Sequence, residues 1–226
     1  MSNVLKQNNE LNYLFDLVIY IAIMFLIRET YIPNSHYLVT GFLYSGTTLI
    51  VATWQMRRRG VTWKSIGLRK PKSIPKTFLK AGLIFITIIA TLLIFNIIQD
   101  SLSIVKESSE AAKGINTGYS LSNGDYAYFF SNIIFVWIQS ALEELLERAF
   151  LITWLEGLFS NLKFKTSLAI IIQACIWGFR HSYDISERSI SVGLIGIIMG
   201  IAYVKFGRNL WPVIIAHCAM NTMSLI

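Results

Sequence analysis

Residues 126–159 read YAYFFSNIIFVWIQSALEELLERAFLITWLEGLF, and this stretch gives the clearest indication of the fold class. Its first part, 126–142, contains no charged residue, and a helix that crosses a bilayer needs about 20 mainly apolar residues. The remainder keeps a helical pattern as far as the Ser160-Asn161-Leu162 turn, so one long helix is expected. The stretch therefore predicts a membrane-embedded helix that carries ionisable residues partway along its length.

The composition of the whole chain agrees with a membrane protein. Of its 226 residues 54% are hydrophobic and only 15% are charged, and the mean hydropathy is +0.54. A soluble domain of this size cannot bury that much apolar surface in one core. This composition excludes a disordered chain, a coiled coil and a secreted disulfide scaffold. The two cysteines, Cys175 and Cys218, lie inside apolar runs and are interpreted as small buried residues.

Charge-free apolar stretches recur along the chain. They predict an all-α fold, a polytopic transmembrane helical bundle of about seven spans, with a range of six to eight. The chain 1–226 is expected to form a single membrane domain. The N-terminal residues do not resemble a cleavable signal peptide, so the first stretch is expected to stay as an anchor. The predicted spans are 13–27, 37–54, 81–99, 126–142, 166–179, 189–204 and 209–226.

The basic residues indicate the orientation in the membrane. Nine of the 20 Lys and Arg residues lie between Arg57 and Lys80, so 55–80 is predicted to be a basic amphipathic cytoplasmic loop. With the N-terminus inside, 14 basic residues fall on the cytoplasmic side and 5 on the other. This bias predicts a cytoplasmic N-terminus. Because the charge is concentrated in one loop, we expect contacts with membrane lipids and no nucleic-acid partner.

Three polar clusters interrupt the later spans, and ionisable residues in a bilayer are candidates for function because their insertion is costly. Each cluster has a structural alternative: a solvated helix end, an interfacial histidine, and a hydrogen bond between helices, respectively. Helical spacing places Arg148 one turn from Glu144, where the two can pair. His217 and Asn221, at i and i+4, share one helix face. The clusters are Glu143-Glu144-Leu145-Leu146-Glu147-Arg148, Trp177-Gly178-Phe179-Arg180-His181 and His217-Cys218-Ala219-Met220-Asn221.

The first two clusters are predicted to meet across a helical hairpin. Glu143 and His181 each lie 19 residues from Leu162, so antiparallel helices joined at that turn place them side by side. The joint set of carboxylates, imidazoles, arginine and carboxamide is suited to hydrolysis. Glu143 could act as a general base on water, His181 could orient that water, and His217 with Asn221 could stabilise an oxyanion.

A metal site is the open alternative to this chemistry. No cofactor is required by the sequence, but two imidazoles and one carboxylate can bind a divalent metal such as zinc. The ligands would be Glu143, His181 and His217. The sequence contains no His-Glu-x-x-His helix, which is the most specific signature of a hydrolytic zinc site.

These residues resemble the CPBP family, the CAAX protease and bacteriocin-processing membrane proteins also called Abi proteins. The family motifs Glu-Glu-x-x-x-Arg, Phe-x-x-x-His and His-x-x-x-Asn/Asp appear here in order. Trp177 stands where the family has Phe, which implies a changed pocket shape. Gly67-Leu68-Arg69 resembles the family's amphipathic loop, and the strong similarity covers 126–226 as a catalytic core. The matching residues are Glu143-Glu144 to Arg148, Trp177 to His181, and His217 to Asn221.

The resemblance implies an intramembrane endopeptidase in which Glu143 activates water. It implies that Glu144 and Arg148 support this base, that His181 lies beside the water, and that His217 and Asn221 contact the oxyanion. Metal-dependent and glutamate-type mechanisms both stay open. The expected location is a bacterial plasma membrane, which the chain crosses several times.

The expected substrates are small membrane-associated peptides or prepeptides, hydrophobic or lipidated, in pheromone processing, bacteriocin processing or bacteriocin self-immunity. The alternative is a non-catalytic immunity or scaffold protein that uses the same polar residues for binding. The oligomeric state is not predicted. An apolar substrate groove is expected to be lined by Trp177, Phe179, Phe150 and Trp154.

Overall fold

The computed structural model of the 226-residue chain describes residues 2–27, 37–106 and 126–223. Within these ranges the chain forms seven helices and no strand, so the all-α prediction is confirmed. Each predicted apolar stretch corresponds to one helix, and the fourth helix is continuous over three segments. The bounds are α1 Ser2–Leu26, α2 Tyr37–Arg58, α3 Ile74–Leu102, α5 Tyr126–Glu144, η3 Leu145–Leu151, α6 Ile152–Leu158, α7 Lys165–Ser182, α8 Glu187–Lys205 and α9 Trp211–Met223.

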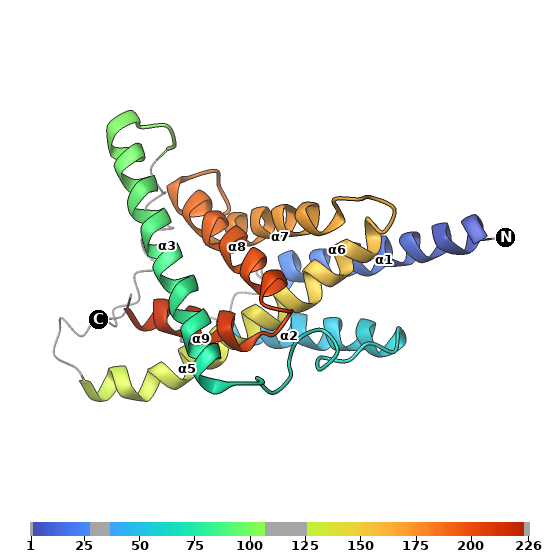
Figure 1. The fold of residues 1–226 in the computed structure, drawn as a ribbon, viewed down its shortest axis with the longest axis horizontal. Coiled ribbons are helices and arrows are strands. Elements are labelled where there is room, and N and C mark those ends of the chain that lie inside the picture. The colour runs from blue at the N-terminus through green and yellow to red at the C-terminus, as the bar shows by residue number, and fades with distance from the viewer. Residues whose placement is uncertain (1, 28–36, 107–125, 224–226) are drawn as a thin grey trace.

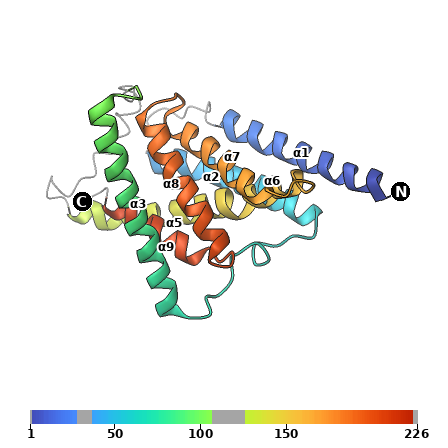
Figure 2. The same ribbon diagram turned by 45° about the horizontal axis from the view of Figure 1, so that its top comes forward.

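The long helix α5–η3–α6 runs through the bundle and contacts α1, α2, α7, α8 and α9 (Figure 1). Helix α1 packs on α6, α2 on α5, and α9 on α5. Helix α7 returns along α6 after the 159–164 turn, as the hairpin prediction requires, and α8 packs along α7. Figure 2 shows α3 crossing α8 and α9 on the far side of the bundle from α1.

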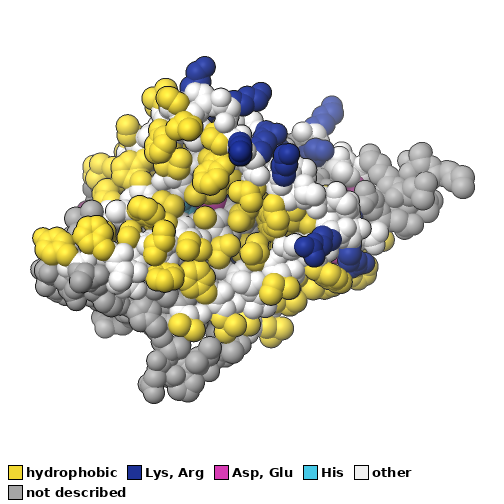
Figure 3. Space-filling view, turned by 90° about the horizontal axis from the view of Figure 1, so that it is seen from below, with side chains coloured by type: hydrophobic (Ala, Val, Ile, Leu, Met, Phe, Trp, Pro, Cys, Tyr) yellow, Lys and Arg dark blue, Asp and Glu magenta, His cyan; other side chains and the backbone are white. Residues whose placement is uncertain are grey.

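Among the described residues, three helices are long and apolar enough to cross a membrane: Ile74–Leu102, Phe129–Leu158 and Glu187–Lys205. Most of the surface of α3 is exposed and apolar, including Phe78, Leu83 and Ile86. In water this surface would be unfavourable, whereas lipid solvates it. Figure 3 shows hydrophobic side chains over one face of the molecule, with Lys and Arg side chains gathered along its edge. The chain is thus a helical membrane protein.

The basic loop between α2 and α3 is shorter than predicted, because both helices extend into it. Helix α2 continues to Arg58 and α3 begins at Ile74, where Ser73 is extended and a proline occupies the first turn. The loop packs on the turn between α8 and α9. The Leu210 amide donates to the Gly67 carbonyl at 3.1 Å, and the Tyr203 hydroxyl donates to the Ile66 carbonyl at 2.6 Å.

Gly67 is required at this contact for two reasons. Its φ is +125°, which side chains rarely tolerate, and a Cβ there would lie 2.7 Å from the Arg208 carbonyl oxygen. The loop that carries the basic residues is therefore fixed directly to α8 and to the turn that leads into α9, the helix of the last motif.

Buried aromatic residues join α1 to the long helix. The rings of Phe150 and Trp154 lie 4.4 Å apart, and Tyr20 of α1 packs on Phe150 at 4.8 Å. The Trp154 Nε1 donates to Asp16 Oδ2 at 3.2 Å, and Arg59 Nε pairs with the same oxygen at 2.6 Å. The Asp16 carboxylate thus accepts a hydrogen bond from the buried Trp154 indole N–H and also pairs with the Arg59 cation.

Gly178 allows α7 and α8 to approach closely, which predicts a destabilised Gly178→Ala variant. A Cβ at Gly178 would overlap the Ser189 carbonyl oxygen and lie 3.0 Å from the Gly193 nitrogen, both of which are backbone atoms that cannot rotate away. Overpacking of this kind costs about 1–3 kcal/mol. Thermal unfolding in detergent should therefore show a lower Tm for Gly178→Ala.

Gly193→Ala is the matched control for this prediction. Its Cβ would meet the Ala174 carbonyl at 3.6 Å, which is ordinary van der Waals contact. We expect the Tm of this variant to equal or exceed that of the wild type, because Ala has the higher helix propensity. Equal Tm values for the two variants would show that the close approach at Gly178 does not limit the packing of α7 on α8.

Candidate active site

The first cluster lies where the long helix changes from α-helical to π-helical geometry. Glu143 and Glu144 end α5, and the π-helix η3 begins at Leu145. Residues 146–151 of this segment are all buried, although they include Glu147 and Arg148. Single π-helical turns inside α-helices occur often at functional sites. Because a π-helical turn is wider than an α-helical turn, the side chains of this segment face different neighbouring helices. The sequence periodicity did not predict this π-helical segment.

Glu144 is the centre of a fully buried ionic cluster. Its Oε2 lies 3.2 Å from Arg148 Nε, which confirms the predicted pair, and its Oε1 lies 2.8 Å from His217 Nδ1. The side chains of Glu144 and Arg148 have no exposed surface. The Arg148 guanidinium also lies 4.3 Å from the centre of the Trp177 ring. The cluster therefore joins the long helix, α7 and α9 at one point.

Glu143 faces a different set of groups and is only partly buried. Trp177 Nε1 donates to its Oε2 at 3.3 Å, and Gln139 Nε2 lies 3.5 Å from its Oε1. The carboxylate also interacts electrostatically with His217, His181 and Arg180. Of the two adjacent carboxylates, Glu143 is therefore the one that a reactant can reach, while Glu144 is enclosed.

Both motif histidines have a partner at Nδ1. His181 Nδ1 lies 2.7 Å from the Trp177 carbonyl, which can only accept, so this nitrogen carries the proton. His217 Nδ1 faces the Glu144 carboxylate, which fixes the same tautomer. The Nε2 atoms of both rings are left for other partners. The Trp177 ring packs edge-on against both imidazoles, at 5.0 Å from His181 and 5.8 Å from His217.

His217 and Asn221 share a helix face, as their spacing predicted. Asn221 Nδ2 donates to Ser140 Oγ at 2.8 Å, one turn away from the contact between His217 and Glu144. Two contacts one turn apart on both helices fix the register of α9 against α5. The structure thus brings together five predicted residues around Trp177 or Glu144, and Asn221 lies one helical turn further along α9.

The four predicted groove residues do not share one exposed face of the structure, although Phe150 and Trp154 are neighbours. Phe150 and Trp154 have no exposed surface because α1 covers them, and Trp177 is only 2% exposed beneath the histidines. Phe179 lies on the outer face of α7, where it packs against Phe25 and Tyr183. Spacing along the helix could not show that α1 occupies this face.

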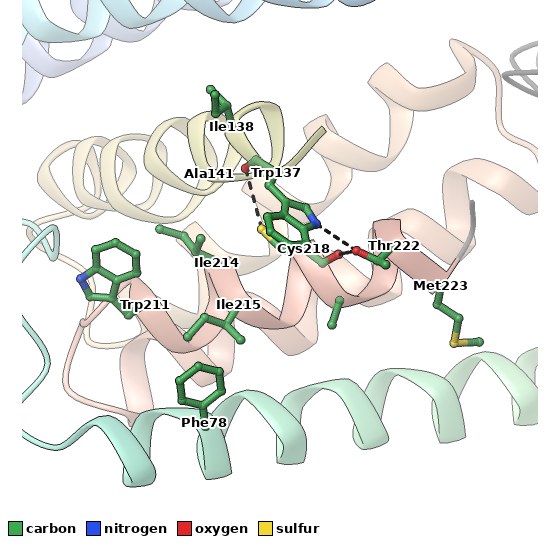
Figure 4. Close-up of a pocket in the computed structure, with 11 residues that line it drawn as sticks. Phe78, Trp137, Ile138, Ala141, Trp211, Ile214, Ile215, Cys218, Thr222 and Met223 are labelled. Carbon is green, nitrogen blue, oxygen red and sulfur yellow. Dashed lines mark hydrogen bonds between the residues drawn. The ribbon is translucent and has the colours of Figure 1, made fainter. Parts of the chain in front are cut away.

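An apolar pocket of about 850 Å³ lies instead between α3, α5 and α9 (Figure 4). Its few polar groups are paired, since Trp137 Nε1 donates to Thr222 Oγ1 at 2.9 Å. Ala141 and Cys218 of its wall directly follow Ser140 and His217, so the pocket adjoins the polar cluster. The lining residues are Phe78, Trp137, Ile138, Ala141, Trp211, Ile214, Ile215, Cys218, Ala219, Thr222 and Met223.

Two further ionisable residues belong to the same region. The guanidinium of Arg180 pairs with the buried carboxylate of Glu147, and Gln173 Nε2 donates to that carboxylate at 3.3 Å. The cost of a charge in a bilayer, which singled out the three motifs, applies equally to Glu147 and Arg180. The cost of a buried charge therefore marks Glu147 and Arg180 as candidates in the sequence, whereas neither residue is a specified position of the family motifs.

A metal site would need several ligand side chains that converge on one point. In the part of the chain that the structure describes, no group of three or more His, Cys, Asp or Glu side chains converges as metal ligands. Glu143, His181 and His217 are neighbours, and because the Nδ1 atoms of both histidines are engaged, Nε2 is the nitrogen that each ring could offer to a metal. The ligand set Glu143, His181 and His217 stays a prediction.

The fold and the cluster define a class: a polytopic helical membrane protein with a carboxylate and imidazole site enclosed by its helices. Residues 126–223 match the family model described as type II CAAX prenyl endopeptidase Rce1-like. This part of the chain is therefore similar to that family of membrane proteases, which lies within the CPBP and Abi proteins. No curated protein and no solved structure matches the chain. The matched region contains all three motifs, and α1, α2 and α3 lie outside it.

Proposed function

We propose that the protein is an intramembrane endopeptidase in which Glu143 activates the hydrolytic water. The observation that carries this proposal is the position of Glu143. It is the accessible carboxylate of the pair, it accepts a hydrogen bond from Trp177, and it lies in the electrostatic reach of both histidines. A general base must lie within hydrogen-bond reach of a water and have its own geometry fixed by neighbours.

The chemistry follows from these positions. Glu143 takes a proton from water while the water oxygen attacks the peptide carbonyl carbon, and the negative charge moves to the carbonyl oxygen. When both ring nitrogens of His217 carry hydrogen, Nδ1–H donates to Glu144 and Nε2–H donates to that oxyanion, and Asn221 supports the same side. Collapse of the intermediate breaks the C–N bond, and Glu143 returns its proton to the leaving amine. The role of Glu144 and Arg148 is to hold His217.

The proposed substrates are small membrane-associated peptides or prepeptides, hydrophobic or lipidated, in the plasma membrane of a bacterium. The description of the matching family is that of a CAAX prenyl endopeptidase, so a prenylated peptide is the first candidate. Processing of a peptide pheromone or bacteriocin, and self-immunity by proteolysis, are the proposed biological settings. Support comes from the apolar pocket between α3, α5 and α9, which adjoins the site and is large enough for a hydrocarbon chain.

A lipid preference can be tested by filling the pocket. The purified chain in liposomes is assayed on a farnesylated peptide and on the same peptide without the lipid. Ala219 lines the pocket and is exposed, so Ala219→Trp should fill part of it. We expect this variant to lose about tenfold in kcat/KM for the lipidated peptide and little for the other, since several buried methylene groups contribute about 0.8 kcal/mol each.

Ala90→Trp is the matched control, because Ala90 is exposed on α3 but does not line the pocket. It should leave both peptides unaffected. If Ala219→Trp lowers kcat/KM equally for the two peptides, the pocket does not select for lipid.

Metal removal separates the two mechanisms. Because Glu143 can perform the proton transfers alone, we expect dialysis against excess chelator to leave kcat within about twofold of its starting value. Loss of cleavage that is restored by zinc and not by magnesium would contradict the glutamate-type mechanism and support Glu143, His181 and His217 as ligands.

A further inference from the structure

Glu147 and Arg180 form a second buried ion pair, which the mechanism above does not use. The side chain of Glu147 is 1% exposed and that of Arg180 is 10% exposed. Moving two charges out of water is costly, and their attraction offsets that cost only when their geometry is well fixed. Apolar residues of similar volume would be as stable at such a position, so the pair is expected to have a role besides stability.

Arg180 is held by contacts with three other elements. Its guanidinium pairs with Glu147 of η3, lies 3.3 Å from the Met24 sulfur of α1, and stacks 4.6 Å from the centre of the Tyr44 ring of α2. Arg180 itself belongs to the last turn of α7 and directly precedes His181. The guanidinium therefore fixes the end of α7 against three other helical segments.

The contacts of Glu147 and Glu143 alternate along α7. Glu147 binds Gln173 and Arg180, and Glu143 binds Trp177, which lies between those two positions. Any shift of α7 that breaks the contacts of Glu147 would therefore also withdraw the Trp177 N–H from Glu143. His181 would move with it, because its Nδ1 is bound to the Trp177 carbonyl.

We propose that Glu147 and Arg180 are positioning residues, which set the register of α7 against the π-helical segment and so hold Trp177 and His181 at Glu143. This inference rests on the proposed function, because it assigns the pair a role in the same hydrolysis. A displacement of about 1 Å in an active site can lower a rate by about 10²-fold. The pair thus acts on the rate of the chemical step more than on substrate binding.

The test is a charge-neutral pair, Glu147→Gln with Arg180→Met, assayed as the full chain in liposomes on the farnesylated peptide. Removing both charges avoids an uncompensated buried ion, so the fold should persist. We expect kcat to fall by about tenfold or more with KM within about twofold, since the ground-state contacts of the substrate stay in place. Arg180→Lys, which retains the charge, should recover part of kcat.

The control is a second ion pair far from Glu143, neutralised in the same way by Asp16→Asn with Arg59→Met. Asp16 and Arg59 are also mostly buried and lie 2.6 Å apart, but they join α1 to the end of α2. We expect wild-type kcat for this control. A wild-type kcat in the Glu147 and Arg180 variant would overturn the proposal. If the variant that combines Glu147→Gln with Arg180→Met does not fold, Arg180→Lys provides the test. A wild-type kcat in Arg180→Lys overturns the proposal as well.

Hydrogen exchange without substrate separates this inference from the proposed function. The amides of residues 177–182 should exchange faster in the neutral pair than in the wild type or the control, because the end of α7 is no longer fixed. Unchanged exchange overturns the positioning role even if no peptide is cut. If the wild type cuts no peptide but these amides exchange faster, the proposed function fails and the role in register stands.

Discussion

Glu143→Gln is expected to lower kcat by about 10²–10⁴-fold, the usual contribution of a general base. The amide has nearly the shape of the carboxylate and can still accept the Trp177 N–H, so the site should keep its geometry. It cannot take a proton from water at neutral pH. The measurement is the initial rate of peptide cleavage in liposomes, together with the Tm of the variant in detergent.

The matched control for this variant is Glu156→Gln on the same long helix. Glu156 Oε1 pairs with Arg208 at 2.7 Å and has no contact with the motif residues. Its replacement should leave kcat at the wild-type value. A Glu143→Gln variant that cuts as fast as Glu156→Gln would show that another group activates the water.

Arg148→Ala is expected to destabilise the fold by about 3–5 kcal/mol, because it leaves a buried carboxylate without its cation. Glu144 has no exposed surface, and water cannot replace the guanidinium without opening the bundle. Removing Arg148 also removes the cation that packs on the Trp177 ring. Thermal unfolding in detergent should show a much lower Tm and a smaller folded yield.

Arg57→Ala provides the comparison, since Arg57 is exposed at the end of α2. Exposed charges away from such contacts change stability by at most about 0.5 kcal/mol. Equal Tm values for the two arginine variants would mean that Glu144 and Arg148 do not form a buried pair in the membrane.

The features that depend on local spacing could be predicted from the sequence. The continuation of the fourth helix to the 159–164 turn, the return of α7, and the pair of Glu144 with Arg148 all follow from helical periodicity. The shared face of His217 and Asn221 follows from the same rule. These predictions held because each concerns residues on one helix or two helices joined by a short turn.

The features that depend on which helix covers which face could not be predicted. Phe150 and Trp154 have the right spacing for a groove, but α1, which is distant in sequence, covers both. The π-helical segment changes which neighbours Glu147 and Arg148 meet, and no periodic signal marks it. Equal spacing from Leu162 predicted that Glu143 lies beside His181. The hydrogen-bond donor to Glu143 is instead Trp177, one helical turn before His181 on α7.

Glu143 is proposed to activate a water for peptide hydrolysis, so the oxygen of that water must enter the new carboxylate. The most direct test is single-turnover cleavage of the farnesylated peptide in H₂¹⁸O by wild type and Glu143→Gln in liposomes, with mass spectrometry of both fragments. We predict that the wild type yields a new carboxylate containing ¹⁸O and a free amine, and that Glu143→Gln yields neither on the same time scale. Labelled product from Glu143→Gln at the wild-type rate would contradict the claim.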